Sequence, residues 1–144
     1  MGKLSYKLVE SDSELKAAFE VRKRVFVAEQ GIPEDIEFDD HENEALHTVA
    51  KDGERVVGTV RVLFLNNSQA KLERMAILKP FRRKGIGSRI IAFLNEELRN
   101  REVKRVVLHA QLPVVAFYES CGFEISGATF WEVGIKHIRM QRRL

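Results

Sequence analysis

The sequence contains one cysteine and no apolar run long enough to span a membrane. A single thiol excludes an internal disulfide, and Cys121 cannot assemble a zinc site by itself. The residues after Met1-Gly2 alternate in character, which excludes the continuous apolar stretch of a signal peptide. The position of Ser5 makes the start a poor myristoylation signal, so no lipid anchor follows from it. We expect a cytoplasmic protein that has no association with a membrane.

Signals for metals and for nucleic acids are also scarce. The four histidines are scattered without the spacing that holds a metal: His41, His47, His109 and His137. The net charge is only +3, because 21 acidic residues offset 24 basic ones and the basic residues are spread through the chain. We therefore expect neither a bound metal nor a nucleic-acid partner.

The chain does have enough apolar sequence for one core. Its 144 residues are 44% hydrophobic, a size and composition typical of one domain that folds alone. The sequence shows no internal repeat, low-complexity tract or linker. We predict a single domain over residues 1–144.

Apolar periodicity near the start predicts a strand followed by a helix. Residues around Tyr6 alternate as in a strand, Ser11 is suited to cap a helix, and Gly31 ends that helix. Arg22 falls on the apolar stripe of the helix. Two interpretations of Arg22 stay open: its guanidinium pairs with an acid or reaches the surface, or it lies near a cofactor or substrate.

An acidic stretch separates this helix from three strands. Residues 34–44 have no clear period, so we expect a loop, with a short helical turn as the alternative. Asp52-Gly53 is a tight-turn signal between two strands, and Gly58 is a candidate bulge. The next strand covers 70–78 and is apolar on both faces near its end, which indicates burial.

Helices and strands alternate in the second half. We predict helices over 86–100 and 114–121, a strand over 103–110, and closing strands at 123–125 and 135–140 around a loop with Trp131. Each helical crossover implies a parallel neighbour. The fold class is therefore α/β with a mixed sheet.

The run Arg82-Arg83-Lys84-Gly85-Ile86-Gly87 lies between an apolar strand and an amphipathic helix. Its glycines let the backbone approach an anion closely, and the N–H groups that open a helix have no partners within it. That end carries the positive pole of the helix dipole, and three cations precede the first glycine. The spacing fits neither a dinucleotide fingerprint nor a triphosphate loop. The run predicts a pyrophosphate site in preference to a purely structural turn.

This run resembles the signature of the GNAT N-acetyltransferase superfamily, which is Arg or Gln, two variable residues, Gly, one variable residue, and Gly or Ala. The resemblance covers most of the chain, including the preceding strand 72–77 and the segment 116–123. It implies an α/β (α+β) fold with a mixed, mostly antiparallel sheet of six to seven strands flanked by helices. A splayed pair of strands would hold the cofactor.

The resemblance implies acetyl-CoA as co-substrate. Backbone groups and cations of the run would hold its pyrophosphate, and the free edge of the preceding strand would hold its pantetheine arm. The backbone N–H of Met75 is the expected oxyanion donor. The implied cofactor residues are Met75, Ala76, Ile77, Arg82, Arg83, Lys84, Gly85, Ile86, Gly87, Ser88 and Gln111. Gln111 stands where the family often has an asparagine, so its side chain must be placed differently.

Tyr118 matches the family position that often supplies a proton to the departing thiolate. Its phenol has an ordinary pKa of about 10 and can donate a proton or hydrogen-bond the sulfur. The alternative is that Phe117-Tyr118 form the packing face of a short helix.

No residue is identified as clearly as the base that removes the proton of the amine. Glu73 is our first choice, directly or through a water, and a structural salt bridge to its neighbour Arg74 is an equal alternative. His47 is either a satisfied strand residue or a proton relay near the substrate. Arg22 and His47 are the candidates for substrate binding.

We predict an enzyme, an acetyl-CoA-dependent N-acetyltransferase that acts directly on a primary amine of a small molecule or a protein. Cys121 is a poor nucleophile because no basic partner is evident. The alternatives are transfer of another acyl group, as in the acyl-homoserine-lactone synthases, a non-catalytic CoA sensor, and an RNA-binding protein. The resemblance also carries the expectation of a homodimer.

Overall fold

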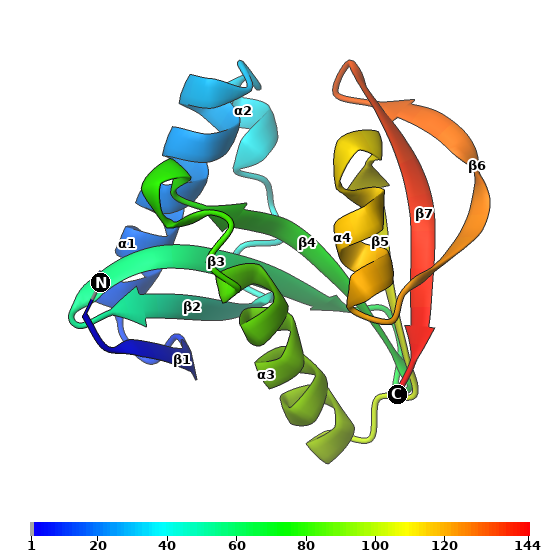
Figure 1. Ribbon diagram of the computed structural model, residues 1–144, viewed down its shortest axis with the longest axis horizontal. Helices are drawn as coiled ribbons and strands as arrows, with labels where there is room; N and C mark the ends of the chain where they lie inside the picture. Colours follow the sequence, from blue (N-terminus) through cyan, green and yellow to red (C-terminus); the bar gives the residue numbers. More distant parts are fainter. Residues whose placement is uncertain (1) are drawn as a thin grey trace.

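Seven strands form one mixed sheet in the computed structural model, which describes residues 2–144 (Figure 1). The strands are β1 (Leu4–Leu8), β2 (Leu46–Asp52), β3 (Arg55–Phe64), β4 (Gln69–Ile77), β5 (Arg105–Gln111), β6 (Glu124–Glu132) and β7 (Ile135–Arg143). They lie in the order β1-β2-β3-β4-β5-β7-β6, and β4 with β5 is the parallel pair in an otherwise antiparallel sheet. The predicted mixed, mostly antiparallel sheet flanked by helices is confirmed.

Helices cover both faces of this sheet. They are α1 (Asp12–Arg22), the π-helix η1 (Lys23–Glu29), α2 (Glu34–Glu37), α3 (Ile86–Asn100) and α4 (Val115–Ser120), with short 3-10 turns η2 (Lys79–Phe81) and η3 (Leu112–Val114). Figure 1 shows α3 and α4 in front of the sheet and α1 behind it. The predicted stripe on α3 is buried, and none of its members is more than 1% exposed: Ile86, Ile90, Ile91, Leu94 and Leu98. Within residues 2–144 no helix is both long and apolar enough to cross a bilayer.

The first helix changes its winding part of the way along. The Ser11 hydroxyl accepts a hydrogen bond from the Glu14 N–H at 3.2 Å, which is the predicted cap. From Lys23 onward the backbone forms a π-helix, and the Gln30 N–H donates to the Val25 carbonyl at 3.2 Å. The sequence pattern indicated one continuous α-helix, so the π-helical second part differs from the prediction. Gly31, with a φ of 73°, ends the segment as expected.

The bulge expected at Gly58 is present. The pairing of β2 with β3 shifts between Ala50, which faces Gly58, and Lys51, which faces Val56. A Cβ atom on Gly58 would lie 2.7 Å from Cδ1 of Ile77, so a larger residue here would force the end of the Ile77 side chain to move.

The strands β4 and β5 separate like the arms of a V. Their pairing runs from Gln69 with Arg105 to Leu72 with Leu108 and stops, although β4 continues to Ile77 and β5 to Gln111. The predicted splayed strand pair is therefore confirmed. Beyond Leu72 the edge of β4 that faces β5 has no strand partner within residues 2–144.

The closing strands differ from the prediction in length and in order. Trp131, predicted in a loop, belongs to β6 and is 70% exposed. The expectation that each crossover gives a parallel neighbour is wrong for the second one. β7 pairs along the whole of β5 and separates it from β6, so the strand that follows α4 is not adjacent to β5. A long hairpin can insert its second strand in this way, because antiparallel pairing needs no crossover.

Candidate active site

A cavity of about 970 Å³ opens where β4 and β5 separate. Its walls come from the end of η1, the unpaired part of β4, the turn before α3, the end of β5, α4, and the hairpin of β6 with β7. Most of the predicted cofactor residues line it: Met75, Ala76, Ile77, Arg82, Arg83, Gly85, Ile86, Gly87, Ser88 and Gln111. The sequence-predicted run and the splayed strands therefore face one shared space.

The glycine turn at this cavity is shaped by backbone conformation and by close packing. Gly85 caps α3 in the left-handed conformation with a φ of 80°, and Arg83 has a φ of 62°. A Cβ on Gly87 would lie 2.9 Å from Cζ of Phe117 and 3.0 Å from Cε of Met75. Glycine at 87 thus brings the start of α3 against β4 and α4, with its first N–H groups at the cavity.

The three cations of the run lie in different places. Arg82 donates from Nε to the Ile77 carbonyl at 2.8 Å and from Nη2 to both carboxylate oxygens of Glu29, at 2.9 and 3.0 Å. Arg83 lines the cavity, whereas Lys84 is exposed and does not. Arg82 therefore joins the end of β4 to η1, and the structure does not bring Lys84 into the cavity.

The expected proton donor and the expected oxyanion donor lie next to each other. The Tyr118 hydroxyl donates to Sδ of Met75 at 3.4 Å. The Tyr118 ring also makes edge contacts with Phe117 and Phe123, with centroid distances of 5.1 and 6.0 Å. Burial raises the pKa of Tyr118 above its ordinary value, so the phenol stays protonated near neutral pH. Tyr118 lines the cavity and also packs, and the two interpretations are compatible.

Glu73 also lines the cavity, but cations occupy its carboxylate. Oε2 accepts from Nη2 of Arg61 at 2.9 Å and from Nη1 of Arg74 at 3.5 Å, while Nζ of Lys71 lies 4.0 Å from Oε1. The Glu73 carboxylate is therefore already engaged by three cations. The geometry favours the structural salt-bridge interpretation of Glu73.

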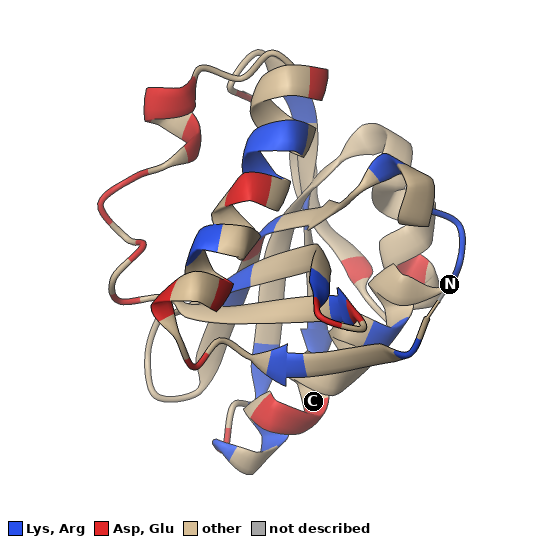
Figure 2. Cartoon of the chain, turned by 90° about the vertical axis from the view of Figure 1, so that its left-hand side faces the viewer, with Lys and Arg blue, Asp and Glu red and all other residues tan. Residues whose placement is uncertain are grey.

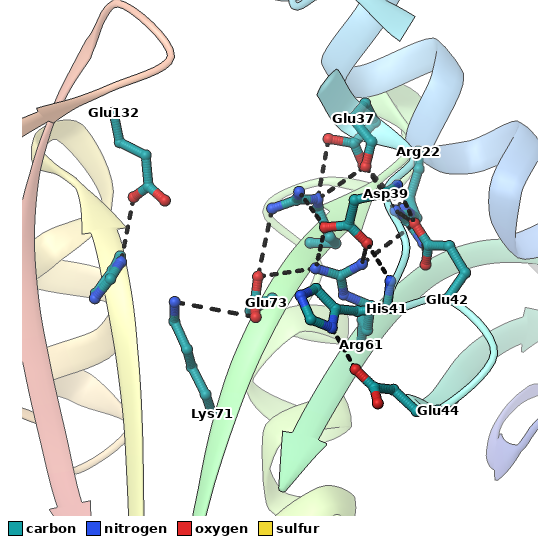
Figure 3. A network of polar contacts seen from close by, with 12 residues as sticks. Arg22, Glu37, Asp39, His41, Glu42, Glu44, Arg61, Lys71, Glu73 and Glu132 are labelled. Atoms are coloured by element: carbon teal, nitrogen blue, oxygen red, sulfur yellow. Dashed lines mark hydrogen bonds and ion pairs between the residues drawn. The ribbon is translucent and has the colours of Figure 1, made fainter. Parts of the chain in front are cut away.

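A buried ion network stands behind this wall of the cavity (Figure 3). Arg22 is 1% exposed, and it donates to the Glu37 carboxylate at 2.9 Å and to both Glu42 oxygens at 2.8 and 2.7 Å. Arg61 is equally buried and donates to Asp39 at 2.6 and 3.0 Å. The network ties α1, the acidic loop and β3 to β4 through these charge-assisted bonds.

The two candidates for substrate binding belong to the network and not to the cavity lining. Arg22 is separated from the cavity by Glu37, which lines it and accepts a hydrogen bond from Arg22. Of the two interpretations of Arg22, the structure therefore favours pairing with an acid. His47 is 7% exposed, and its Nε2 lies 2.8 Å from the Glu42 carbonyl. Burial lowers the pKa of His47, which keeps it neutral. Neither Arg22 nor His47 lines the cavity, so the structure does not place either side chain against a ligand there.

Burial and ion pairing act in opposite directions on the acids of the network. Burial raises the pKa of Glu37 despite its bonds to Arg22 and Arg74. Burial also opposes ionisation of Asp39, but the hydrogen bonds from Arg61 and the His41 N–H outweigh it and lower the pKa of Asp39 to about 2. Figure 2 shows the acidic residues of α2 and the following loop along one side of the molecule.

Sequence reasoning missed a polar pair on the opposite wall. Nδ1 of His109, on β5, lies 3.2 Å from Oε2 of Glu132, near the end of β6, and both residues line the cavity. Period-two alternation could have placed His109 on the same face as Gln111. Glu132 carried no signal, because β6 was predicted to end before it. Gln111 donates to Oε1 of Gln30 at 3.0 Å, a second contact that sequence did not indicate.

Cys121 is outside the cavity lining and 8% exposed, and burial raises the pKa of its thiol. A thiol with a raised pKa is a poor nucleophile. Within residues 2–144 no group of three or more His, Cys, Asp or Glu side chains could hold a metal ion.

The family model for the acetyltransferase (GNAT) domain matches residues 9–144. The uncharacterized N-acetyltransferase YjcF of Bacillus subtilis is 36% identical over 136 residues, which covers 94% of this chain and 96% of YjcF. A putative N-acetyltransferase structure from Lactobacillus plantarum superposes with a TM-score of 0.93 at 24% identity, over 99% of both chains. A GNAT family acetyltransferase from Elizabethkingia anophelis with acetyl-CoA bound has a TM-score of 0.77 at 14% identity, over 98% of both chains. With a match that spans nearly its whole length, this chain belongs to the GNAT acetyltransferase family and is an acyltransferase.

Proposed function

We propose that the protein transfers an acetyl group from acetyl-CoA directly to a primary amine, which is a small molecule or a protein amino group. The observation that carries this proposal is the cavity at the separation of β4 and β5, which joins a glycine-rich helix start to an unpaired strand edge. A CoA molecule needs both features, because it has a pyrophosphate at one place and amides along its pantetheine arm. The fold neighbour with bound acetyl-CoA supports the same co-substrate.

In this proposal the cofactor runs along β4. Backbone N–H groups from Arg83 to Ser88 bind the pyrophosphate, and the Arg83 side chain at the cavity adds positive charge. The free edge from Met75 to Ile77 binds the pantetheine amides, and the Met75 N–H stabilises the oxyanion that forms on the thioester. Gln111 closes the opposite side through its bond to Gln30.

The transfer occurs within a ternary complex. A neutral amine attacks the carbonyl carbon of the thioester, the C–S bond breaks, and Tyr118 gives its proton to the departing thiolate. Within residues 2–144 the Tyr118 hydroxyl is hydrogen-bonded to the Met75 sulfur and to no charged group, and its raised pKa keeps the phenol protonated near neutral pH. The buried thiol of Cys121 takes no part, so no acetyl-enzyme forms.

Calorimetry with acetyl-CoA, followed by thiol release over a panel of amines, tests this function. We expect saturable binding of acetyl-CoA and amine-dependent release of free CoA. Faster release from longer acyl-CoA donors would assign a different acyl group, and tight binding without release for any amine would make the protein a CoA sensor. Acetyl-cysteine as a required intermediate in intact-mass spectra would contradict direct transfer. The homodimer expected from the resemblance stays a prediction, which sedimentation equilibrium tests.

A further inference from the structure

His109 occupies the inner end of the cavity, at the point where the sheet divides. It is the first residue of β5 beyond the last pair, Leu72 with Leu108, and Glu73 is the corresponding residue of β4. Both side chains line the cavity, and Met75 follows on β4 two positions after Glu73. An imidazole therefore stands at the fork, in the space shared with Met75 and Tyr118.

The contacts of His109 fix the orientation of its ring. Nδ1 lies 3.2 Å from Oε2 of Glu132, and the Phe130 ring packs edge-on at a centroid distance of 4.9 Å. A carboxylate accepts only, so a neutral His109 places its hydrogen on Nδ1. Nε2 then keeps a lone pair, and no residue of the described chain, 2–144, forms a hydrogen bond with it. A carboxylate that orients a histidine in this way also stabilises the imidazolium.

Charged groups approach His109 from several strands. Lys71 and Glu73 come from β4, and Glu132 comes from β6. From β7, the pairing register sets Arg139 directly opposite, and His137 lines the same cavity and stacks on the Phe130 ring. Burial together with Lys71 lowers the pKa of His109, against the opposing influence of Glu132 and Glu73. The imidazole is thus neutral at pH 7 and ready to accept a proton. Figure 3 shows Glu132 on the opposite side of the gap from Lys71 and Glu73.

We propose that His109, oriented by Glu132, is the base that removes the proton from an alkylammonium acceptor. This role rests on the acetyl transfer proposed above. An alkylamine has a pKa of about 10 and arrives as a cation that cannot attack a thioester. Glu132 lines the same end of the cavity, and its carboxylate favours a cationic acceptor.

The protons balance over one turnover. Nε2 of His109 takes one proton from the ammonium, the neutral nitrogen forms the C–N bond, and the C–S bond breaks. The thiolate takes the Tyr118 proton, and the phenolate recovers a proton from the positively charged acylated nitrogen, which thereby becomes the neutral amide. The products are the N-acetyl amine, the CoA thiol and one proton, which His109 passes to solvent.

Kinetics of His109→Gln test the assignment, because glutamine keeps hydrogen bonding and cannot act as a base. We expect kcat/KM for an alkylamine to fall by at least about 10²-fold, with calorimetric binding of acetyl-CoA unchanged. The rising limb of the pH profile should disappear, and imidazole in the buffer should restore activity to His109→Ala. The loss should be much smaller for an arylamine, which arrives neutral. The matched control is His41→Gln, at an exposed histidine outside the cavity.

A second readout does not need turnover. Nitrogen NMR of the imidazole should show hydrogen on Nδ1 of His109 near neutral pH, and Glu132→Gln should change that tautomer distribution. Hydrogen on Nε2 in the wild-type protein would overturn the assignment. If the wild type is active and His109→Gln is equally active, the role of His109 is overturned but acetyl transfer is not. A wild type that releases no thiol with any amine would instead overturn acetyl transfer itself, and the His109 role with it.

Discussion

The phenol of Tyr118 lies 3.4 Å from the sulfur of Met75, so the proposed acid on α4 contacts the side chain of the residue on β4 whose backbone N–H is the proposed oxyanion donor. Gly87 makes the contact possible, since any larger residue there would push on Met75 and on Phe117, the neighbour of Tyr118. Three segments far apart in the sequence thereby meet at the proposed reaction centre.

Tyr118→Phe should lower kcat while leaving the KM for acetyl-CoA nearly unchanged, because only the transition state uses the proton. A positioned general acid contributes about 10²–10⁴-fold. Steady-state thiol release measures the effect. An unchanged kcat across the pH range would remove the acid role and leave Tyr118 as a packing residue. Since the pKa of Tyr118 is raised, wild-type activity should show no loss from its ionisation up to about pH 10.

The two glycines of the turn should fail in different ways. Gly85→Ala places a side chain in the left-handed conformation with open space around it, so we expect a loss of about 1–2 kcal/mol of folding free energy. Gly87→Ala has an ordinary backbone but presses on Met75 and Phe117, so its main effect should be weaker binding of acetyl-CoA. Urea unfolding and calorimetry on both variants separate the two effects. Equal loss of affinity in the two variants would contradict this distinction.

Replacement of Arg22 should be costly for stability, because it leaves buried carboxylates without a partner. Arg22→Met is expected to cost about 3–5 kcal/mol, with Arg24→Ala, at an exposed position, near zero. Adding Glu37→Gln and Glu42→Gln to Arg22→Met should recover part of the loss. A stability of Arg22→Met equal to the wild type would show that the network contributes nothing to folding.

Asp39 should make the network sensitive to acid. Its folded pKa of about 2 lies below its ordinary value of 3.8, so it contributes stability above about pH 4 that is lost as the pH falls toward 2. Asp39→Asn should therefore be less stable by about 2 kcal/mol at pH 7, with a difference that shrinks below pH 4. The exposed neighbour Asp40→Asn is the control. A constant difference between pH 7 and pH 2 would contradict the assigned pKa.

Sequence patterns correctly predicted the elements that depend on residues close together in the chain. The cap at Ser11, the stripe on α3, the bulge at Gly58 and the turn at Asp52-Gly53 each depend on a few neighbouring residues. The resemblance supplied the splayed strands and the cavity at the glycine run. Neither could place Lys84 outside the cavity, because that depends on how the turn directs each side chain. Neither could place Arg22 behind the cavity wall, because that depends on its distant partners Glu37 and Glu42.

The pair of His109 with Glu132 is a second contact between distant residues that the sequence pattern could not predict. It exists only because β7 inserts between β5 and β6 and the hairpin extends as far as Glu132. Strand order is a property of the whole sheet, and no spacing within residues 105–111 encodes it. A single sequence showed a histidine in a strand, and the fold gave it a partner.

Only four residue pairs, from Gln69 with Arg105 to Leu72 with Leu108, join the first four strands to the last three. The sheet is thus two blocks joined along a short seam. A ligand whose amides bridge the open arms would act as an extra strand and lengthen that seam. At 100 times its Kd such a ligand would add about 2.7 kcal/mol of folding free energy. The rate of amide hydrogen exchange should fall in both β4 and β5 when the cofactor is bound. The donor substrate would then also stabilise the fold by connecting the two parts of the sheet.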